Sequence, residues 1–213
     1  MINDFNHCLE NILKASGYDG YQKYNKDLVP DGATKKKWDI LEPYLEDIKD
    51  KKILDLGGNM GFFSFKTDSL GANTTYVDNN HRLSAYCKLF SKSIKSNVNF
   101  LTGDAVKICN QMDEQFDYII MLASYMHICR TEKNTSDDEI KYNFNCEPTL
   151  NAVRKRCRGK IFLEFTEEYS KINHTYGPEW CIANFEKDIG RHFSEFKVIG
   201  KSTHTRPIYL IEA

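Results

Sequence analysis

The chain has 213 residues, of which 41% are hydrophobic and 28% are charged, the ordinary composition of a soluble globular protein. Its 29 basic and 30 acidic residues give a net charge of −1, so no overall positive field would attract nucleic acid or an anionic membrane. No apolar run approaches the ~18 residues of a membrane span, and the first residues do not resemble a signal peptide. Seven scattered cysteines without a CxxC pair indicate reduced thiols, a cytoplasmic location and no metal site.

Apolar runs alternate with amphipathic stretches along the chain, and this alternation predicts a parallel α/β sheet. Two helices, 3–15 and 34–48, are expected before the first strand. We therefore expect one domain over residues 1–213. It would consist of an N-terminal helical cap, 1–48, and a Rossmann-like core, 49–213.

Seven strands are expected in the core. In chain order they are 52–56, 74–78, 98–101, 116–121, 160–165, 195–200 and 207–211. The intervening helices are expected at 62–70, 81–95, 104–112 and 179–192. A further helix is expected to end near Arg156. The short link between the last two strands predicts an antiparallel pair. A polar, Tyr-rich stretch, 18–30, is expected to be too irregular for a core element, and a long polar segment, 130–147, leads into the helix that ends near Arg156.

The most specific pattern is Asp55–Gly61, which reads Asp-Leu-Gly-Gly-Asn-Met-Gly, closes a strand and opens a helix. Glycines let the backbone turn tightly and approach a ligand closely, and a helix N-terminus favours a nucleotide. The dehydrogenase fingerprint GxGxxG fails, because Asn59 and Phe62 stand where it needs glycines. What remains, D-x-G-x-x-x-G, predicts a different nucleotide-cofactor turn.

Two further acids follow the next two expected strands. Asp78 lies 21 residues after Gly57, where a carboxylate can accept both ribose hydroxyls of an adenosine cofactor. Asp104 follows the third strand. With Asp55, these acids end three successive strands at the sheet edge where such folds bind ligands.

The D-x-G-x-x-x-G pattern resembles motif I of class I S-adenosylmethionine-dependent methyltransferases. The resemblance implies a Rossmann-like seven-stranded, mostly parallel sheet with a C-terminal antiparallel hairpin, and S-adenosyl-L-methionine as cofactor. The residues implied to bind the cofactor are Tyr21, Lys37, Asp55, Gly57, Gly58, Asn59, Gly61, Asp78, Asn79, Asp104, Ala105 and Leu122. Tyr21 and Lys37 would meet its carboxylate, and Asp104 the adenine amine. Lys37 is equally interpreted as one of three solvated lysines.

Short matches over most of the chain resemble glycan O-methyltransferases. They are Lys37–Asp39, Tyr125–Ile128, Phe162–Glu164 and Arg206–Leu210. The resemblance extends to the methyltransferase half of the kinase–methyltransferase that caps bacterial O-antigen mannan. General likeness and size also point to the methyltransferase domain of chlorovirus glycosyltransferases. These likenesses imply a sugar hydroxyl as acceptor, a terminal rhamnose in the second case, and a place in a larger multidomain glycan-synthesis protein.

Methylation of a hydroxyl calls for a base that removes its proton. His127, just past the fourth strand, is one candidate, and a structural, hydrogen-bonded histidine is the alternative. Glu164, inside an apolar run, is the second, because burial would raise the pKa of its carboxyl. Its alternative is a carboxylate that is bound to backbone amides or that orients a substrate hydroxyl. His174 is the third.

Two other functions remain open. The Lys-Trp-Asp entry to motif I also resembles a tRNA-modifying methyltransferase family, and Arg154–Arg158 offers a basic patch for RNA phosphates. The near-zero net charge argues against that interpretation. A non-catalytic module that binds S-adenosylmethionine within a larger assembly is the other alternative.

Overall fold

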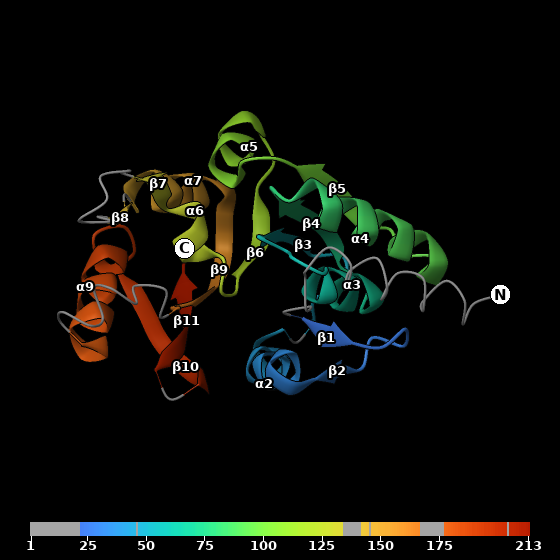
Figure 1. Ribbon diagram of the computed structural model, residues 1–213, viewed down its shortest axis with the longest axis horizontal. Coiled ribbons are helices and arrows are strands. Elements are labelled where there is room, and N and C mark those ends of the chain that lie inside the picture. The colour runs from blue at the N-terminus through green and yellow to red at the C-terminus, as the bar shows by residue number, and fades with distance from the viewer. Residues whose placement is uncertain (1–21, 46, 134–141, 145, 167–176, 204) are drawn as a thin grey trace.

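The computed structural model describes residues 22–45, 47–133, 142–144, 146–166, 177–203 and 205–213. At its centre is a seven-stranded sheet in the order β10-β11-β9-β6-β3-β4-β5 (Figure 1). The expected antiparallel hairpin is present at the β10–β11 edge, and the remaining strands are parallel to one another. This mixed sheet confirms the predicted Rossmann-like methyltransferase fold.

The strands of this sheet are β3 (Lys52–Leu56), β4 (Asn73–Asp78), β5 (Asn99–Thr102), β6 (Phe116–Met121), β9 (Cys157–Glu164), β10 (Glu195–Thr203) and β11 (Arg206–Glu212). The helices are α2 (Gly32–Leu41), α3 (Phe62–Ser69), α4 (His81–Ile94), α5 (Ala105–Gln111), α6 (Tyr125–Ile128), α7 (Glu147–Arg156) and α9 (Pro178–Gly190). Each of the seven expected strands is found, with small differences at its ends.

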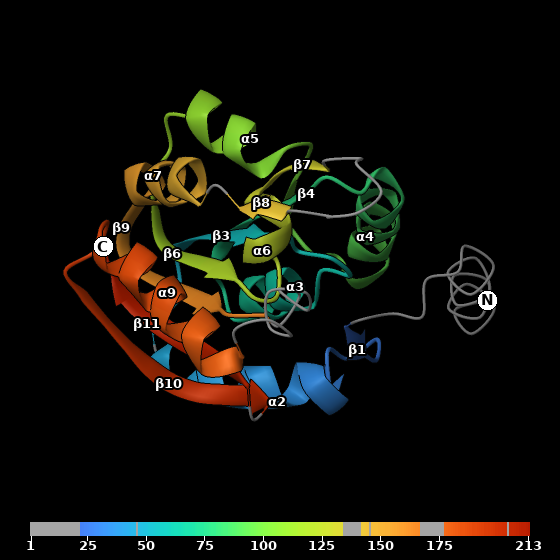
Figure 2. The same ribbon diagram turned by 60° about the vertical axis from the view of Figure 1, so that its left-hand side comes forward.

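Two hydrophobic layers enclose the sheet, because successive side chains of a strand point to opposite faces. Ile53 of β3 packs with α2 and α3, whereas Leu54 and Leu56 pack with residues of α6, α7 and α9. Helices α2, α3 and α4 cover one face, and α5, α6, α7 and α9 cover the other (Figure 2). The three-layer arrangement leaves the carboxyl ends of the parallel strands open for a site.

Of the two helices expected in the N-terminal cap, one needs correction and the other lies outside the described residues. The helix expected over 34–48 ends at Leu41 and continues only as a 3-10 turn, η1 (Glu42–Tyr44). Pro43 explains the early end, because it has no N–H to donate and its ring clashes with the preceding turn. The helix expected over 3–15 lies outside the described residues.

The two polar stretches contain short strands that the sequence did not reveal. Strands β1 (Lys23–Tyr24) and β2 (Pro30–Asp31) form one antiparallel pair, and β7 (Arg130–Lys133) and β8 (Tyr142–Phe144) form another. Two to four residues are too few to show a periodic pattern, and their pairing depends on tertiary contacts.

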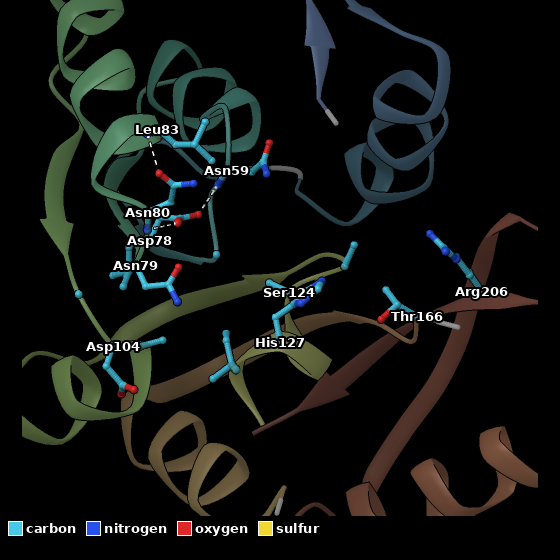
Figure 3. A pocket seen from close by; sticks show the side chains of 16 residues that line it. Asn59, Asp78, Asn79, Asn80, Leu83, Asp104, Ser124, His127, Thr166 and Arg206 are labelled. Carbon is cyan, nitrogen blue, oxygen red and sulfur yellow. Dashed lines mark hydrogen bonds between the residues drawn. The ribbon is translucent and has the colours of Figure 1, made fainter. Parts of the chain in front are cut away.

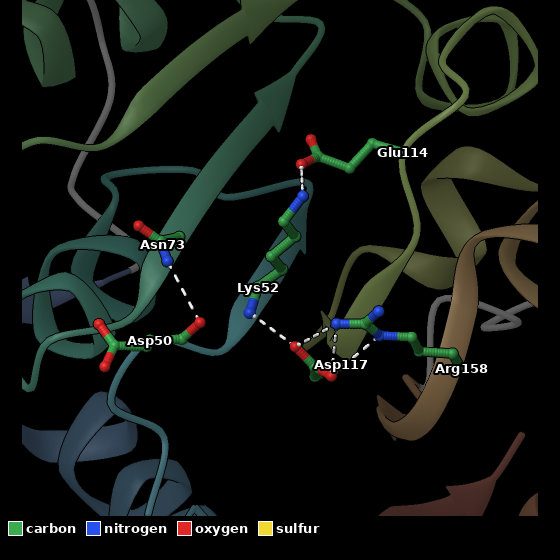
Figure 4. A network of polar contacts seen from close by, with 6 residues as sticks. All are labelled: Asp50, Lys52, Asn73, Glu114, Asp117 and Arg158. Carbon is green, nitrogen blue, oxygen red and sulfur yellow. Dashed lines mark hydrogen bonds and ion pairs between the residues drawn. The ribbon is translucent and has the colours of Figure 1, made fainter.

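A polar network ties three central strands together at the edge opposite to the site (Figure 4). Asp117 of β6 accepts a hydrogen bond from the backbone N–H of Lys52 at 2.9 Å. It also accepts two from the Arg158 guanidinium, at 3.0 and 3.1 Å. Because Lys52 begins β3 and Arg158 lies near the start of β9, one carboxylate fixes the amino ends of three adjacent strands.

Candidate functional site

A cavity of about 500 Å³ lies at the carboxyl ends of β3, β4, β5, β6 and β9 (Figure 3). Its walls come from the loops and helix starts that follow these strands. The lining residues are Gly57, Asn59, Val77, Asp78, Asn79, Asn80, Leu83, Gly103, Asp104, Ala105, Ala123, Ser124, His127, Ile128, Thr166 and Arg206.

The turn after β3 comes close to its neighbours, and this closeness requires glycine. Gly57 has φ +73°, and a Cβ there would lie 2.3 Å from the Cβ of Ser124. A Cβ at Gly58 would lie 2.3 Å from the ring of Tyr76. The N–H groups of both glycines donate to the Val77 carbonyl, at 2.8 and 3.1 Å. The turn is thereby pressed against the end of β4, and its backbone forms part of the cavity wall.

Two backbone N–H groups fix the carboxylate of Asp78 at the end of β4. Its Oδ2 accepts the N–H of Asn59 at 2.9 Å, and its Oδ1 accepts the N–H of Asn80 at 2.8 Å. Burial raises the pKa of Asp78, while the hydrogen bonds from backbone N–H groups lower it. Each carboxylate oxygen has further acceptor capacity, so the pair can accept the two hydroxyls of a ribose.

The next part of the cavity suits a base attached to that ribose. Asp104 begins α5, where its Oδ1 accepts the N–H of Lys107 at 2.8 Å. Leu83 and Ile128 supply apolar side chains to the wall. Asn80 caps α4 by accepting the N–H groups of Arg82 and Leu83. Apolar walls with a few fixed polar groups are typical of cofactor sites.

A second group of polar side chains lies toward β9 and β11 in Figure 3. Thr166 is 2% exposed, and its Oγ1 has no hydrogen-bond partner among the described residues. Arg206 contributes a guanidinium, and His127 projects from α6 into the cavity. A buried hydroxyl without a partner is costly, so Thr166 offers a hydrogen bond to a ligand.

The predicted cofactor residues divide into those that line the cavity and those that support it. Lining residues are Gly57, Asn59, Asp78, Asn79, Asp104 and Ala105. Four other described residues, Asp55, Gly58, Gly61 and Leu122, are not among those that line the cavity. Asp55 is 3% exposed and accepts a hydrogen bond from Ser64 Oγ at 2.6 Å. Burial raises the pKa of Asp55 to about 7.

The charged ends of Lys37 and Glu164, expected to meet the cofactor carboxylate and the acceptor proton, contact each other in this structure. Their Nζ and Oε2 atoms are 2.7 Å apart, and both side chains are buried. Glu164 also accepts a hydrogen bond from Ser202. Neither Lys37 nor Glu164 is among the residues that line the described cavity. Lys37 is therefore not the solvated lysine of the alternative interpretation either.

Two predicted residues, Tyr21 and His174, lie outside the described residues. The sequence interpretation missed Asn80, Leu83, Ser124, Thr166 and Arg206, all of which line the cavity. Asn80 could have been found, because an asparagine before an amphipathic run is a helix N-cap signal.

The described residues also bear on metal binding and on crossing a membrane. They contain no group of three or more His, Cys, Asp or Glu side chains placed to hold a metal ion. None of their helices combines the length and the apolar character that crossing a bilayer requires.

Comparison with known proteins bears on the cofactor. Residues 54–140 match the family model described as a methyltransferase domain. No curated protein matches the sequence. Similar solved structures include the bifunctional kinase-methyltransferase WbdD, with 19% identity, a TM-score of 0.61, and coverage of 93% of this chain and 41% of that one.

Two other similar structures contain the cofactor or its product. One is the 16S rRNA N2 G1207 methyltransferase of T. thermophilus with AdoMet and guanosine, with 15% identity, a TM-score of 0.58, and coverage of 86% of this chain and 43% of that one. The other is the magnesium protoporphyrin IX methyltransferase of Synechocystis PCC 6803 with SAH, with 12% identity, a TM-score of 0.59, and coverage of 98% and 100%.

The chain spans about two fifths of the length of the rRNA enzyme and of WbdD. At these identities the structural likenesses establish the fold. The matched model covers the cofactor turn, Asp78, Asp104 and His127, and all lining residues of the cavity except Thr166 and Arg206. Residues 54–140 thus match a methyltransferase domain, the fold is the Rossmann-like fold of methyltransferases, and together they indicate S-adenosyl-L-methionine as the cofactor.

Proposed function

We propose that this protein transfers the methyl group of S-adenosylmethionine to a hydroxyl oxygen of a sugar in a glycan. The observation that carries the proposal is the second polar end of the cavity, beyond the ribose and adenine residues. There Thr166, whose hydroxyl has no hydrogen-bond partner within the described part of the chain, and the guanidinium of Arg206 line the same cavity as His127. Hydroxyl and guanidinium groups of this kind suit an acceptor rich in hydroxyl oxygens.

His127 is the better placed of the two described base candidates. The cofactor, when bound, supplies a methyl group on a sulfonium, and the acceptor hydroxyl must lose a proton as its oxygen attacks. His127 lines the cavity and is exposed to it. The carboxylate of Glu164 is committed to Lys37 and Ser202 instead. We therefore assign proton removal to His127, and the positioning of β9 to Glu164.

The choice of a glycan acceptor is supported by the resemblance of the sequence to glycan O-methyltransferases. The rRNA enzyme has the same fold, so RNA is the competing acceptor. Arg158 belongs to the basic run Arg154–Arg158, the patch proposed for RNA phosphates. It forms its ion pair with Asp117 at the sheet edge opposite to the cavity. An RNA strand on that run would lie far from the methyl group, which favours the glycan.

An acceptor screen tests the proposal directly. The protein is incubated with isotope-labelled S-adenosylmethionine and a panel of oligosaccharides, including rhamnose-terminated ones, together with tRNA and rRNA fragments. Mass spectrometry should show the gain of one methyl group on a sugar oxygen. Methylation of RNA alone would overturn the acceptor class. Tight cofactor binding with no methylated product from any class would favour the non-catalytic alternative.

Variants at the base candidates test the mechanism on whichever acceptor the screen finds. His127→Ala should lower turnover by about 10²–10⁴-fold while leaving cofactor affinity close to that of the wild type. His81→Ala, at the exposed start of α4, is the matched control and should keep normal turnover. If His127→Ala turns over normally, proton removal by this residue is excluded.

A further inference from the structure

The cofactor turn is held from its outer side by the N-terminal segment that precedes α2. Gln22 is 8% exposed, and its Oε1 accepts the backbone N–H of Phe62 at 2.9 Å. Tyr24 donates its phenolic hydrogen to the Met60 carbonyl. Both contacts span more than 30 positions of sequence, and they end on Met60 and Phe62, at the end of the turn and the start of α3.

The contact from Gln22 supplies what the helix itself lacks. Helix α3 begins at Phe62, and its N-cap residue is Gly61, which has no side chain to accept a hydrogen bond. The first N–H groups of a helix have no partner within it and need one from elsewhere. Gln22 provides that partner from a separate segment, so the start of α3 depends on the N-terminal strand.

The contact from Tyr24 fixes the orientation of the turn. Asn59 adopts φ +53°, a left-handed conformation that costs energy for a residue with a side chain. Its N–H points inward to Asp78, and its carbonyl points outward to the Tyr76 hydroxyl at 2.8 Å. Tyr24 holds the next carbonyl, that of Met60. Outer hydrogen bonds therefore help to keep the Asn59 N–H directed at the carboxylate that we assign to the ribose.

Tyr24 is itself firmly placed. Its ring packs against Phe62 of α3 and Phe90 of α4, with ring centroids 5.4 and 5.7 Å away, respectively. The N–H of Lys23 donates to Thr34 Oγ1 at 2.9 Å, which fastens the same strand to α2. Burial raises the pKa of Tyr24 well above its ordinary value, so the phenol keeps the hydrogen that it donates.

We propose that Gln22 and Tyr24 are positioning residues for S-adenosylmethionine, which act through the Gly57–Gly61 turn without touching the cofactor. The N-terminal segment is then part of the cofactor site and not merely a cover for the sheet. Loss of either contact should weaken cofactor binding by more than the accompanying loss of stability explains.

The test compares two tyrosines that each lose one hydroxyl. Tyr24→Phe removes the hydrogen bond to the Met60 carbonyl. Tyr209→Phe removes a hydrogen bond of 2.9 Å to Glu186 Oε1, and neither Tyr209 nor Glu186 lines the cavity. The dissociation constant of S-adenosylhomocysteine is measured by calorimetry well below both melting temperatures. Tyr24→Phe should raise it about three- to tenfold, and Tyr209→Phe should leave it within about twofold.

A second variant and a second measurement keep the proposal testable if Tyr24→Phe folds poorly. Gln22→Met keeps the side-chain volume but removes the acceptor oxygen, and it should raise the dissociation constant by a similar factor. Amide hydrogen exchange at Asn59 and Phe62 should become faster in both variants and stay unchanged in Tyr209→Phe. Wild-type affinity in Tyr24→Phe or Gln22→Met, or an equal loss in Tyr209→Phe, would overturn the proposal.

Discussion

The Lys37 ammonium and the Glu164 carboxylate form an ion pair at 2.7 Å, with side-chain exposures of 4% and 0%. The pair joins α2, in the N-terminal part of the chain, to the end of β9 beside the cavity. Ser202 of β10 donates a further hydrogen bond to Glu164. Three segments that are distant in sequence therefore meet at one carboxylate.

Removing one partner of this pair should be strongly destabilising. Lys37→Met would leave the Glu164 carboxylate buried without its counter-charge, and we expect the free energy of unfolding to fall by about 3–5 kcal/mol. Lys37→Met combined with Glu164→Gln should recover part of that loss, because no charge then stays buried. Urea unfolding measures both. Lys35→Met, which breaks the exposed pair with Asp39, is the control and should cost less than about 0.5 kcal/mol.

The assignment of the ribose to Asp78 predicts a loss of affinity without a loss of fold. Asp78→Ala should weaken S-adenosylhomocysteine binding by about 1.5–3 kcal/mol, the usual value of hydrogen bonds to a charged group. Calorimetry gives the dissociation constant, and Asp113→Ala, at an exposed carboxyl outside the cavity lining, provides the comparison. Unchanged affinity in Asp78→Ala would remove this residue from the cofactor site.

Much of the fold and of the cofactor end could be predicted because the relevant signals are local. The end of a single strand and a fixed distance after the glycine turn are enough to predict Asp78. The buried face of α2 also had a local signal, since Thr34, Lys37, Trp38 and Leu41 follow helical spacing and are buried. That spacing already separates Lys37 from the exposed Lys35 and Lys36.

The end of the cavity that we propose for the acceptor could not be predicted, because long-range strand pairing assembles it. The N–H of Phe165 donates to the Pro207 carbonyl at 3.0 Å, which brings Thr166 next to Arg206. Nothing near either residue in the sequence reveals this antiparallel pairing of β9 with β11. The partner of Lys37 could not be predicted for the same reason, since Glu164 lies on β9, which is distant from Lys37 in the sequence.

The network around Asp117 predicts a graded effect on stability. Asp117→Asn keeps an oxygen for the Lys52 N–H but weakens the pair with Arg158, which is 53% exposed. We expect it to cost less than about 1 kcal/mol, as exposed ion pairs do. Asp117→Ala also removes the acceptor of the Lys52 N–H and should cost about 1–3 kcal/mol. Equal unfolding free energies for the two variants would show that the Lys52 hydrogen bond contributes nothing.

Asp55 predicts a dependence of stability on pH. Burial raises the pKa of its carboxyl from 3.8 to about 7, against the lowering effect of the Ser64 hydrogen bond, and the nearby Asp78 raises it further. In the unfolded chain the carboxyl ionises near pH 4, whereas in the folded chain it keeps its proton until about pH 7. The favourable contribution is therefore complete below about pH 4 and is lost as the pH rises to about 7.

The full loss corresponds to about 4 kcal/mol, because each unit of pKa difference is worth about 1.36 kcal/mol. Asp55→Asn cannot ionise, and its amide oxygen can still accept the hydrogen of Ser64. The free energies of unfolding of the cofactor-free wild type and Asp55→Asn are compared by urea titration at intervals from pH 4 to pH 8. The free energy of unfolding of the wild type should fall relative to that of the variant as the pH rises to about 7. Above about pH 7 the two curves should run parallel. Curves that stay parallel throughout would show that Asp55 ionises in the folded protein at its ordinary pKa.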